Sequence, residues 1–207
     1  MDRPTKIVCV GRNYVDHAKE MGNDVPKEPL IFLKPPSSVI ANGESIALPP
    51  QSAQVEHEGE IGVIIDRTLR RVSAEETKGA IRAIVAVNDV TARDLQRSDS
   101  QWTRAKGFDT FCPVGEPAAP PADFGSLTVV TRVNGQERQR GKGSDMVFSI
   151  PDVISYVSHI MTLEPGDLIC TGSPAGVGKL SDGDEVEVEV IGLSRVKNRV
   201  TTLNGNA

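Results

Sequence analysis

The run His57-Glu58-Gly59-Glu60-Ile61-Gly62-Val63-Ile64-Ile65 places two carboxylates two positions apart at the start of an apolar, β-branched segment. Alternate residues of a strand project from one face, so Glu58 and Glu60 can point at a single object. A third acid, Asp89, stands near the end of the apolar run 84–90. Three converging carboxylates raise one another's pKa unless a cation holds them, and hard divalent cations prefer oxygen ligands. A metal site is therefore one hypothesis. The alternative is that the acids are solvated at a strand end, and the short E-x-E pattern has this origin more often.

The chain around this run is rich in short strands. Valine and isoleucine content, period-two alternation and flanking turn residues predict strands at 6–10, 30–33, 58–66, 84–90, 127–133, 167–171 and 185–190. Two Asn-Gly pairs, at 42–43 and 134–135, predict hairpins over 39–48 and after residue 133. Because helices do not alternate regularly with these strands, we expect an α+β, β-rich fold and not a doubly wound sheet.

A few short helices complete the expected elements. Ser73-Ala74-Glu75-Glu76 is a capping-box sequence that predicts a helix to about residue 82. Ser149-Ile150-Pro151-Asp152 predicts an amphipathic helix through about residue 161, with proline in its first turn. The polar stretch from residue 13 to about 22 also reads as helical, as does a turn over 91–96, and the run from there to residue 109 looks irregular.

Length and composition bound the class of protein. The 207 residues suit one domain, which we take as residues 1–207, and they can bury a substantial core. The net charge of −5 and the absence of a basic stripe argue against nucleic-acid binding. No apolar stretch approaches 18 residues and no charged-then-apolar leader opens the chain, so we expect no membrane contact and a cytoplasmic location. The three cysteines lie in or beside apolar runs, which indicates buried, reduced thiols.

A second group of candidate residues lies in the helical stretch near the start of the chain. His17 and Glu20 stand three positions apart, so a helix would set them side by side. A carboxylate next to an imidazole fixes its tautomer and raises its basicity, which suits a general base. The alternative is an ordinary surface histidine in a polar helix. From this pair alone, the surface histidine is the favoured interpretation.

Two further segments contain residues that suggest chemistry. Lys106 lies in the fairly apolar segment 106–113, and a buried lysine requires a partner such as the carboxylate cluster. A solvated loop lysine is the simpler interpretation of this segment alone. The glycine-rich segment 172–180 superficially suggests a phosphate-binding P-loop. It lacks the first glycine of that motif, with Ser173 at its place, and Leu180 replaces the magnesium-binding hydroxyl.

Seven short motifs follow one another in a fixed order between residues 11 and 178. They are Gly11-Arg12-Asn13-Tyr14, His17-x-x-Glu20, Phe32-x-Lys34-Pro35 with Ser37, His57-Glu58-x-Glu60, Asn88-Asp89-x-Thr91-x-Arg93-Asp94-x-Gln96, Lys106-Gly107-Phe108-Asp109 and Thr171-Gly172-Ser173-Pro174-Ala175-Gly176-Val177-Gly178. Taken together and in this order, these motifs resemble the fumarylacetoacetate hydrolase superfamily. The resemblance is more specific for the superfamily than for a substrate.

The resemblance implies a mixed β-sandwich or roll of the family's C-terminal domain type and assigns roles to nine residues. Glu58, Glu60 and Asp89 would bind Mg²⁺ or Mn²⁺, with Ca²⁺ as a further candidate occupant. His17 and Glu20 would activate water, and Lys106 would stabilise developing negative charge. Substrate contacts would come from Arg12, Gln96 and Thr171. Longer members carry a fourth acidic ligand, where this chain reads Val8-Cys9-Val10-Gly11, so three protein ligands are expected.

The short chain resembles the compact acylpyruvase branch of the superfamily. We therefore expect a metal-dependent hydrolase that cleaves the C–C bond of acylpyruvate-like 2,4-diketo acids to pyruvate and a carboxylic acid. Decarboxylation of oxaloacetate and isomerisation of a 2-hydroxyhepta-2,4-diene-1,7-dioate-type substrate are alternatives at the same site. A non-catalytic module that binds a divalent metal is the alternative from another class. The expected partners are a small 2-oxo acid and a second copy of the chain in a homodimer.

Overall fold

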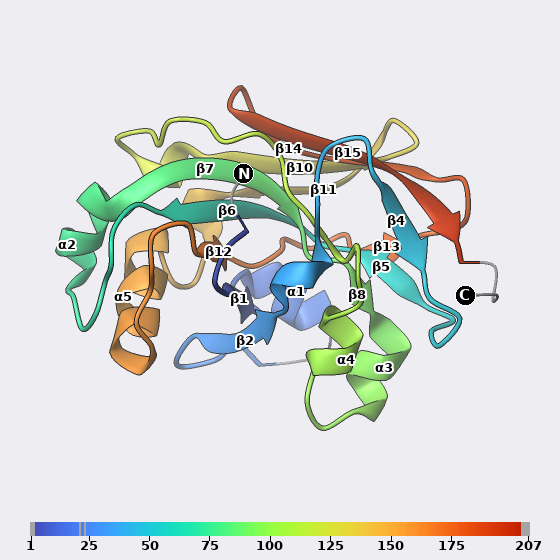
Figure 1. The fold of residues 1–207 in the computed structure, drawn as a ribbon, viewed down its shortest axis with the longest axis horizontal. Coiled ribbons are helices and arrows are strands. Elements are labelled where there is room, and N and C mark those ends of the chain that lie inside the picture. Colours follow the sequence, from blue (N-terminus) through green and yellow to red (C-terminus); the bar gives the residue numbers. More distant parts are fainter. Residues whose placement is uncertain (1–2, 21, 23, 204–207) are drawn as a thin grey trace.

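Two five-stranded sheets lie face to face in the computed structural model, which describes residues 3–20, 22 and 24–203 (Figure 1). The first sheet has the order β2-β1-β12-β6-β7, in which β1 and β12 are parallel and the other neighbours antiparallel. Its strands are β1 (Ile7–Gly11), β2 (Leu30–Lys34), β6 (Gly59–Ile65), β7 (Ile81–Asn88) and β12 (Leu168–Cys170). The largest buried apolar cluster contains side chains of both sheets, which confirms the β-rich sandwich or roll.

The second sheet has the order β11-β10-β14-β15-β4. Its strands are β4 (Ser45–Leu48), β10 (Thr128–Val133), β11 (Gln136–Lys142), β14 (Glu185–Val190) and β15 (Ser194–Thr202). In β14 the three valines are buried and the glutamates are more exposed, as the alternation of the sequence predicts. Two small sheets join β13 (Gly178–Lys179), β5 (Val55–His57) and β8 (Thr91–Ala92), and β3 (Val39–Ile40) with β9 (Cys112–Pro113).

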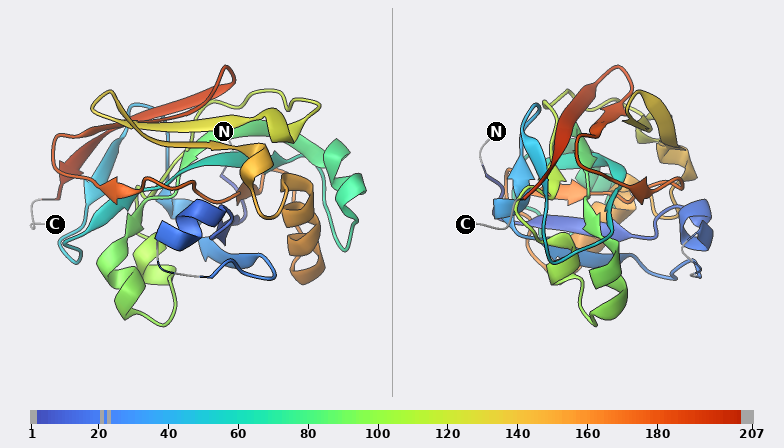
Figure 2. Two further views of the ribbon diagram at one scale, coloured as in Figure 1. Left: turned by 180° about the vertical axis from the view of Figure 1, so that it is seen from behind. Right: turned by 90° about the vertical axis from the view of Figure 1, so that its right-hand side faces the viewer.

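Short helices lie at the two ends of the molecule: α2 and α5 at one end and α3 and α4 at the other, with α1 between them (Figures 1 and 2). They are α1 (Val15–Glu20), α2 (Ala74–Thr77), α3 (Arg93–Ser98), α4 (Thr103–Lys106) and α5 (Ile150–Ile160), with 3₁₀ turns at Pro36–Ser38, Lys78–Ala80, Phe124–Ser126 and Gly143–Asp145. The Ser73 capping box and the Ser149 N-cap are both formed. None of the helices in the described part of the chain has the length and apolar character that a bilayer span requires.

Several sequence-based boundaries need correction. The hairpin predicted over 39–48 is wrong, because β3 pairs in parallel with β9 and β4 pairs in parallel with β15. The Asn42-Gly43 turn binds another strand: Asn42 Oδ1 accepts from the Lys197 N–H at 2.9 Å, and the Gly43 N–H donates to the Lys197 carbonyl at 2.9 Å. The helix predicted to reach residue 82 ends as a 3₁₀ turn at Ala80, and the supposedly irregular run to residue 109 contains α4.

Candidate active site

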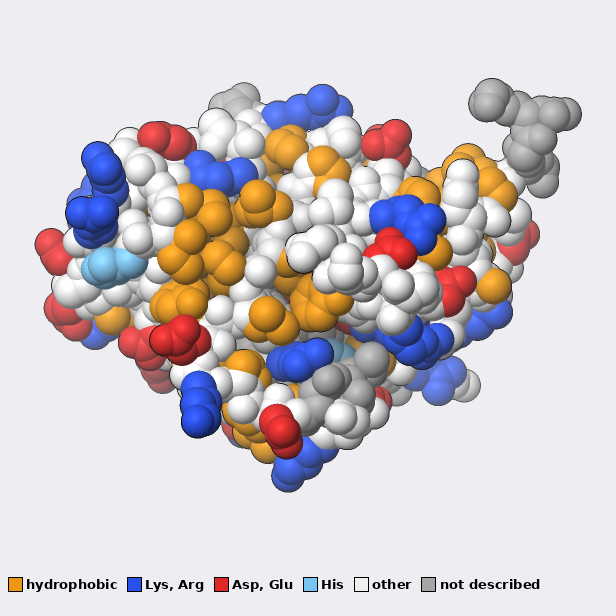
Figure 3. Space-filling view, turned by 90° about the horizontal axis from the view of Figure 1, so that it is seen from below, with side chains coloured by type: hydrophobic (Ala, Val, Ile, Leu, Met, Phe, Trp, Pro, Cys, Tyr) orange, Lys and Arg blue, Asp and Glu red, His pale blue; other side chains and the backbone are white. Residues whose placement is uncertain are grey.

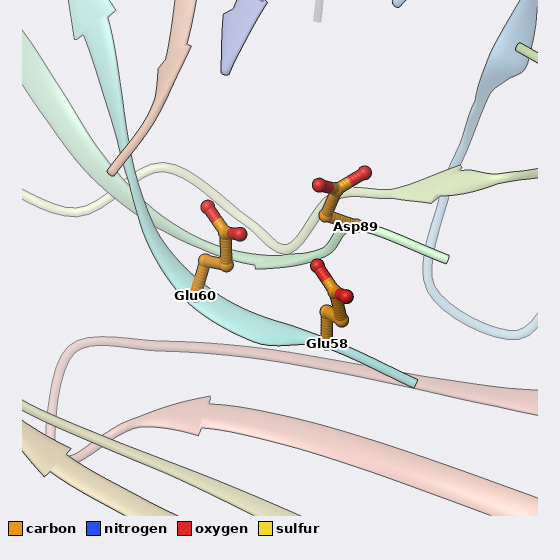
Figure 4. Close-up of side chains that lie close together, drawn as sticks. All are labelled: Glu58, Glu60 and Asp89. Atoms are coloured by element: carbon orange, nitrogen blue, oxygen red, sulfur yellow. The ribbon is translucent and has the colours of Figure 1, made fainter. Parts of the chain in front are cut away.

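Three buried carboxylates converge where the start of β6 lies beside the end of β7. Glu58 lies between β5 and β6, Glu60 lies in β6, and Asp89 directly follows β7. The antiparallel register sets Gly59 opposite Asn88, and the Asp89 N–H donates to the Glu58 carbonyl at 2.8 Å. The acidic side chains point toward one another (Figure 4), and one oxygen of each lies within 4.8 Å of the other two. Strand pairing therefore assembles the cluster that the E-x-E spacing suggested.

The neighbouring histidine turns away from this cluster, as strand alternation predicts. His57 Nδ1 lies 2.9 Å from Gln139 Oε1, and burial lowers the pKa of its imidazole. The Gln139 amide donates in turn to the Ser173 hydroxyl at 2.7 Å and to the Pro174 carbonyl at 2.8 Å. His57 is thus linked through Gln139 to the glycine-rich loop, and it does not belong to the carboxylate cluster.

Buried cations neutralise two of the three acids. Lys106 Nζ lies 2.8 Å from Glu58 Oε2 and 2.6 Å from Asp89 Oδ2. Lys34 Nζ donates to Asp89 Oδ1 at 2.7 Å, and Arg93 pairs with Glu58 as well as with Glu56. Burial would raise the pKa of Glu58, but the charges of Lys106 and Arg93 hold it well below its usual range. The same carboxylates raise the pKa of Lys106 although burial opposes this, so its charge persists.

Glu60 is the acid of the cluster without a cationic partner among the described residues. Its carboxylate accepts from the Gly172 N–H at 2.8 Å, and 1% of the residue is exposed. Burial and the charges of Asp89 and Glu58 raise its pKa well above the usual range. A divalent cation between the three acids would remove this repulsion, and the donor set consists of hard oxygens. The residues present therefore fit Mg²⁺ or Mn²⁺, with Glu58, Glu60 and Asp89 as its protein ligands.

The histidine–carboxylate pair of α1 faces the same cavity. His17 Nδ1 lies 3.2 Å from Glu20 Oε2, and the His17 residue is 5% exposed. Glu20 also accepts from the Gly176 N–H at 3.1 Å, which ties α1 to the glycine-rich loop. A cavity of about 470 Å³ is lined by both residues of the pair together with the three acids and Lys106. The chain thus brings together a possible base, a cation and an oxygen ligand set in one space.

The three residues expected to contact substrate occupy different positions. Arg12 and Gln96 line the cavity, and Gln96 Oε1 accepts from Arg93. Thr171 is fully buried, its hydroxyl donates to the Ile61 carbonyl at 2.8 Å, and it is not among the residues that line the cavity. Substrate contact by these three residues stays a prediction.

Lys34 and Arg93 also contact the acids of the cluster, although their positions in the sequence do not predict these contacts. Lys34 ends the apolar strand β2 and is 1% exposed, while Arg93 opens α3 and is 2% exposed. A lysine at the end of an apolar run was the available signal, since buried lysines are rarely unpaired. Nothing in the spacing of Arg93 revealed that it bonds Glu58.

Comparison with known proteins identifies a family. The family model described as "Fumarylacetoacetate (FAA) hydrolase C-terminal" matches residues 6–201. The chain is 45% identical over 199 residues to a mitochondrial protein of Arabidopsis thaliana named oxaloacetate tautomerase FAHD1, covering 93% of this chain and 89% of that protein. It is 39% identical over 212 residues to oxaloacetate tautomerase YisK of Bacillus subtilis, covering 96% of this chain and 70% of that protein.

A solved structure shows the same fold. The 5-carboxymethyl-2-hydroxymuconate delta-isomerase from Mycobacterium smegmatis superposes with a TM-score of 0.90 at 42% sequence identity, and the match covers 97% of this chain and 80% of that chain. The two chains are therefore similar in sequence as well as in fold.

Proposed function

This chain belongs to the fumarylacetoacetate hydrolase family, and we propose that it enolises a small 2-oxo acid held at a divalent cation between Glu58, Glu60 and Asp89. The supporting observation is that the buried carboxylate cluster, the Lys106 ammonium and the His17–Glu20 pair line one cavity. Relatives named oxaloacetate tautomerase and a structural neighbour named as an isomerase support keto–enol exchange as the principal reaction. A structural ion alone would need neither a base nor an extra cation beside it.

Each protein group has a distinct task in this proposal. Bound Mg²⁺ or Mn²⁺ would supply Lewis-acid charge. His17, oriented by Glu20, takes a proton from the carbon beside the 2-oxo group. The Lys106 ammonium stabilises the negative charge that develops on the 2-oxo oxygen. Return of a proton to that oxygen completes the exchange from the keto to the enol form, so no bond between heavy atoms breaks.

Hydrolysis of acylpyruvates is the second candidate, and the histidine–carboxylate pair favours it. His17 would then take a proton from water, which attacks the carbonyl at C4 of a 2,4-diketo acid. The C3–C4 bond breaks, the hydroxyl remains on the acyl group as a carboxylic acid, and the bonding electrons pass to the pyruvate enolate. Decarboxylation of oxaloacetate forms the same enolate without water, so it does not require the base.

One set of assays separates these reactions. Metal-free protein is supplemented with Mg²⁺, then given oxaloacetate or acetylpyruvate, while the ultraviolet absorbance of the enol and the release of pyruvate are followed. We expect Mg²⁺-dependent enol–keto exchange of oxaloacetate, lost with a chelator and restored by added Mg²⁺. Exchange, hydrolysis and decarboxylation that all stay at the uncatalysed rates with Mg²⁺ would refute the proposal. Full activity after exhaustive chelation would refute the role of the metal.

A further inference from the structure

One peptide group connects Glu60 to a fully buried asparagine. The peptide bond between Thr171 and Gly172 directly follows β12. Its N–H, which belongs to Gly172, donates to Glu60 Oε2 at 2.8 Å. Its carbonyl, which belongs to Thr171, accepts from Asn13 Nδ2 at 2.8 Å, and Asn13 is 0% exposed. Hydrogen bonds at the two ends of one peptide polarise each other, so the Asn13 contact makes the Gly172 N–H a stronger donor to Glu60.

The side-chain amide of Asn13 is held in one orientation. Its Nδ2 also donates to the Phe148 carbonyl at 3.0 Å, and its Oδ1 accepts from the Phe148 N–H at 2.8 Å. A primary amide has two N–H donors and a carbonyl acceptor, so each of these groups has a partner. If the amide were rotated, its NH₂ group would meet the Phe148 N–H, which is also a donor. The contacts with Phe148 therefore direct one N–H of Asn13 at the Thr171 carbonyl.

The backbone is unusual on both sides of this contact. Gly172 has φ +104°, a conformation that favours glycine, and a Cβ on it would lie 2.7 Å from the Asn13 Cβ. Arg12, the residue before Asn13, has φ 60°, which residues other than glycine rarely adopt. Such strain persists where surrounding contacts enforce it, and the buried hydrogen bonds of Asn13 supply those contacts. Close packing thus leaves the Thr171–Gly172 peptide little freedom to rotate.

Glu60 depends on this peptide more than the other two acids of the cluster would. Glu58 and Asp89 are oriented by ion pairs with buried lysine and arginine side chains. The hydrogen bond that the described structure gives the Glu60 carboxylate is the one from the Gly172 N–H. Groups that hydrogen-bond a metal ligand fix its direction and tune the affinity for the metal. Asn13 is not among the residues that line the cavity, so it acts on Glu60 through the peptide and not through the substrate.

We infer that Asn13 is a positioning residue that orients Glu60 toward the divalent cation through the Thr171–Gly172 peptide. This inference rests on the proposed function, because it concerns the cation between Glu58, Glu60 and Asp89. It gives a role in the metal site to a residue that lies outside both the ligand set and the cavity.

Calorimetric titration of Mg²⁺ into the metal-free Asn13→Ala variant tests this role. We expect an affinity at least about tenfold weaker than in the wild type, the lower end of the range for a lost partner of a metal ligand. Asn198→Ala is the matched control, because Asn198 is also buried and its Nδ2 donates to the Ala41 and Glu44 carbonyls, away from the cluster. It should also lower the free energy of unfolding, but its Mg²⁺ affinity should stay within about twofold of the wild type because it shares no partner with the acids.

A measurement on the wild type covers the case in which Asn13→Ala does not fold. In nuclear magnetic resonance spectra of isotope-labelled protein, added Mg²⁺ should shift the backbone amide signal of Gly172 and the side-chain amide signals of Asn13 with one midpoint. The side-chain signals of Asn198 should stay in place.

Three results would overturn the inference: Mg²⁺ binding by Asn13→Ala that is as tight as in the wild type, equally weakened binding by Asn198→Ala, or side-chain signals of Asn13 that do not respond to Mg²⁺. Failure of the wild type itself to bind Mg²⁺ would instead contradict the proposed function on which the inference rests.

Discussion

Glu60 differs from the other two acids of the cluster in what surrounds its carboxylate. Glu58 and Asp89 each contact two cationic side chains, whereas the described hydrogen bond of Glu60 comes from a backbone N–H. An ion pair in the interior offsets part of the cost of removing a charge from water, and Glu60 lacks that compensation. Its ionised form is therefore the one that gains most from a bound cation, and the metal hypothesis depends on it more than on either neighbour.

At the residue scale, His17→Ala tests the proposed base. We expect the rate of enol–keto exchange to fall by about 10²-fold or more, the range typical of a lost general base. Mg²⁺ affinity should stay within about twofold, because His17 is not a proposed ligand. His159→Ala is the control, since His159 is exposed on α5 and bonds the Ser155 carbonyl. Wild-type exchange in the His17 variant would exclude the assignment, and decarboxylation that survives would confirm that this reaction does not use the base.

The cysteines give a second prediction at this scale. All three are free and fully buried. Burial raises the pKa of Cys9 to about 11, and hydrogen bonds with Cys112 and Cys9, together with burial, raise the pKa of Cys170 well above its usual range. The thiolate is the reactive form, and little of it exists at pH 8 on Cys9 and Cys170 because their pKa values are raised. Burial keeps reagents away from Cys112. A thiol-reactive disulfide reagent at pH 8 should label none of the cysteines in the folded protein and three after unfolding in guanidinium. Rapid labelling of the folded protein would show that the strands around Cys9, Cys112 and Cys170 open easily.

At the scale of elements, the two Asn-Gly pairs show what local sequence can predict. Asn134-Gly135 joins β10 to β11 as an antiparallel hairpin, with Asn134 at φ 52° and Gly135 at φ 78°. Asn42-Gly43 also makes a tight turn, yet its flanking strands belong to different sheets. The residues of a turn predict the turn itself. The partners of β3 and β4, by contrast, are strands more than 60 residues away in the sequence. For the same reason, the sequence does not predict that Lys34 and Arg93 contact the acids of the cluster.

The carboxylate cluster was easier to anticipate than its counterions. Glu58 and Glu60 are separated by one residue, and Asp89 follows the strand that pairs with Glu60, so period-two geometry and one antiparallel pairing bring them together. Lys106 comes from α4 and Lys34 from β2, neither of which is paired with β6. The positions of these two lysines depend on tertiary packing. The spacing of residues along one sequence does not show which distant segments pack together.

Gly176→Ala tests the contact between α1 and the glycine-rich loop. A Cβ at this position would lie 2.0 Å from the Arg138 carbonyl oxygen, and Gly176 has φ +101°. We expect the free energy of unfolding to fall by about 1–3 kcal/mol. Activity should fall further, because the Gly176 N–H anchors Glu20. Chemical denaturation provides the measurement. Gly79→Ala, which meets open space at an ordinary φ, should leave the unfolding free energy nearly unchanged, and equal effects of the two changes would contradict this explanation.

At the scale of the whole molecule, apolar side chains on the surface suggest a partner. Figure 3 shows a connected patch of hydrophobic side chains on the left half of the lower face. Strand β2 forms one edge of the first sheet and carries Leu33, which is 48% exposed, and α5 ends in Ile160, which is 54% exposed. A sheet edge that carries apolar residues is usually covered. We therefore propose a homodimer with a symmetric interface that buries at least about 1,000 Å².

Light scattering at micromolar concentration checks this proposal. The expected mass is about twice the 22.2 kDa of one chain. Leu33→Asp should shift the equilibrium toward the monomer, because a charge placed in an apolar interface is desolvated without a partner. Lys78→Asp on the exposed turn after α2 is the control, and it should leave the mass unchanged. A wild-type mass near that of one chain would reject the dimer.

A calorimetric titration of Mg²⁺ into the metal-free protein and into its Glu60→Gln variant tests the proposed metal site directly. The amide keeps the size of the side chain but removes the charge that lacks a cationic partner. We expect one Mg²⁺ per chain in the wild type and an affinity at least about 100-fold weaker in the variant, a larger loss than removal of a hydrogen-bond partner of a ligand typically causes. Equal affinity in the two proteins, or no Mg²⁺ binding by the wild type, would contradict a metal site formed by Glu58, Glu60 and Asp89.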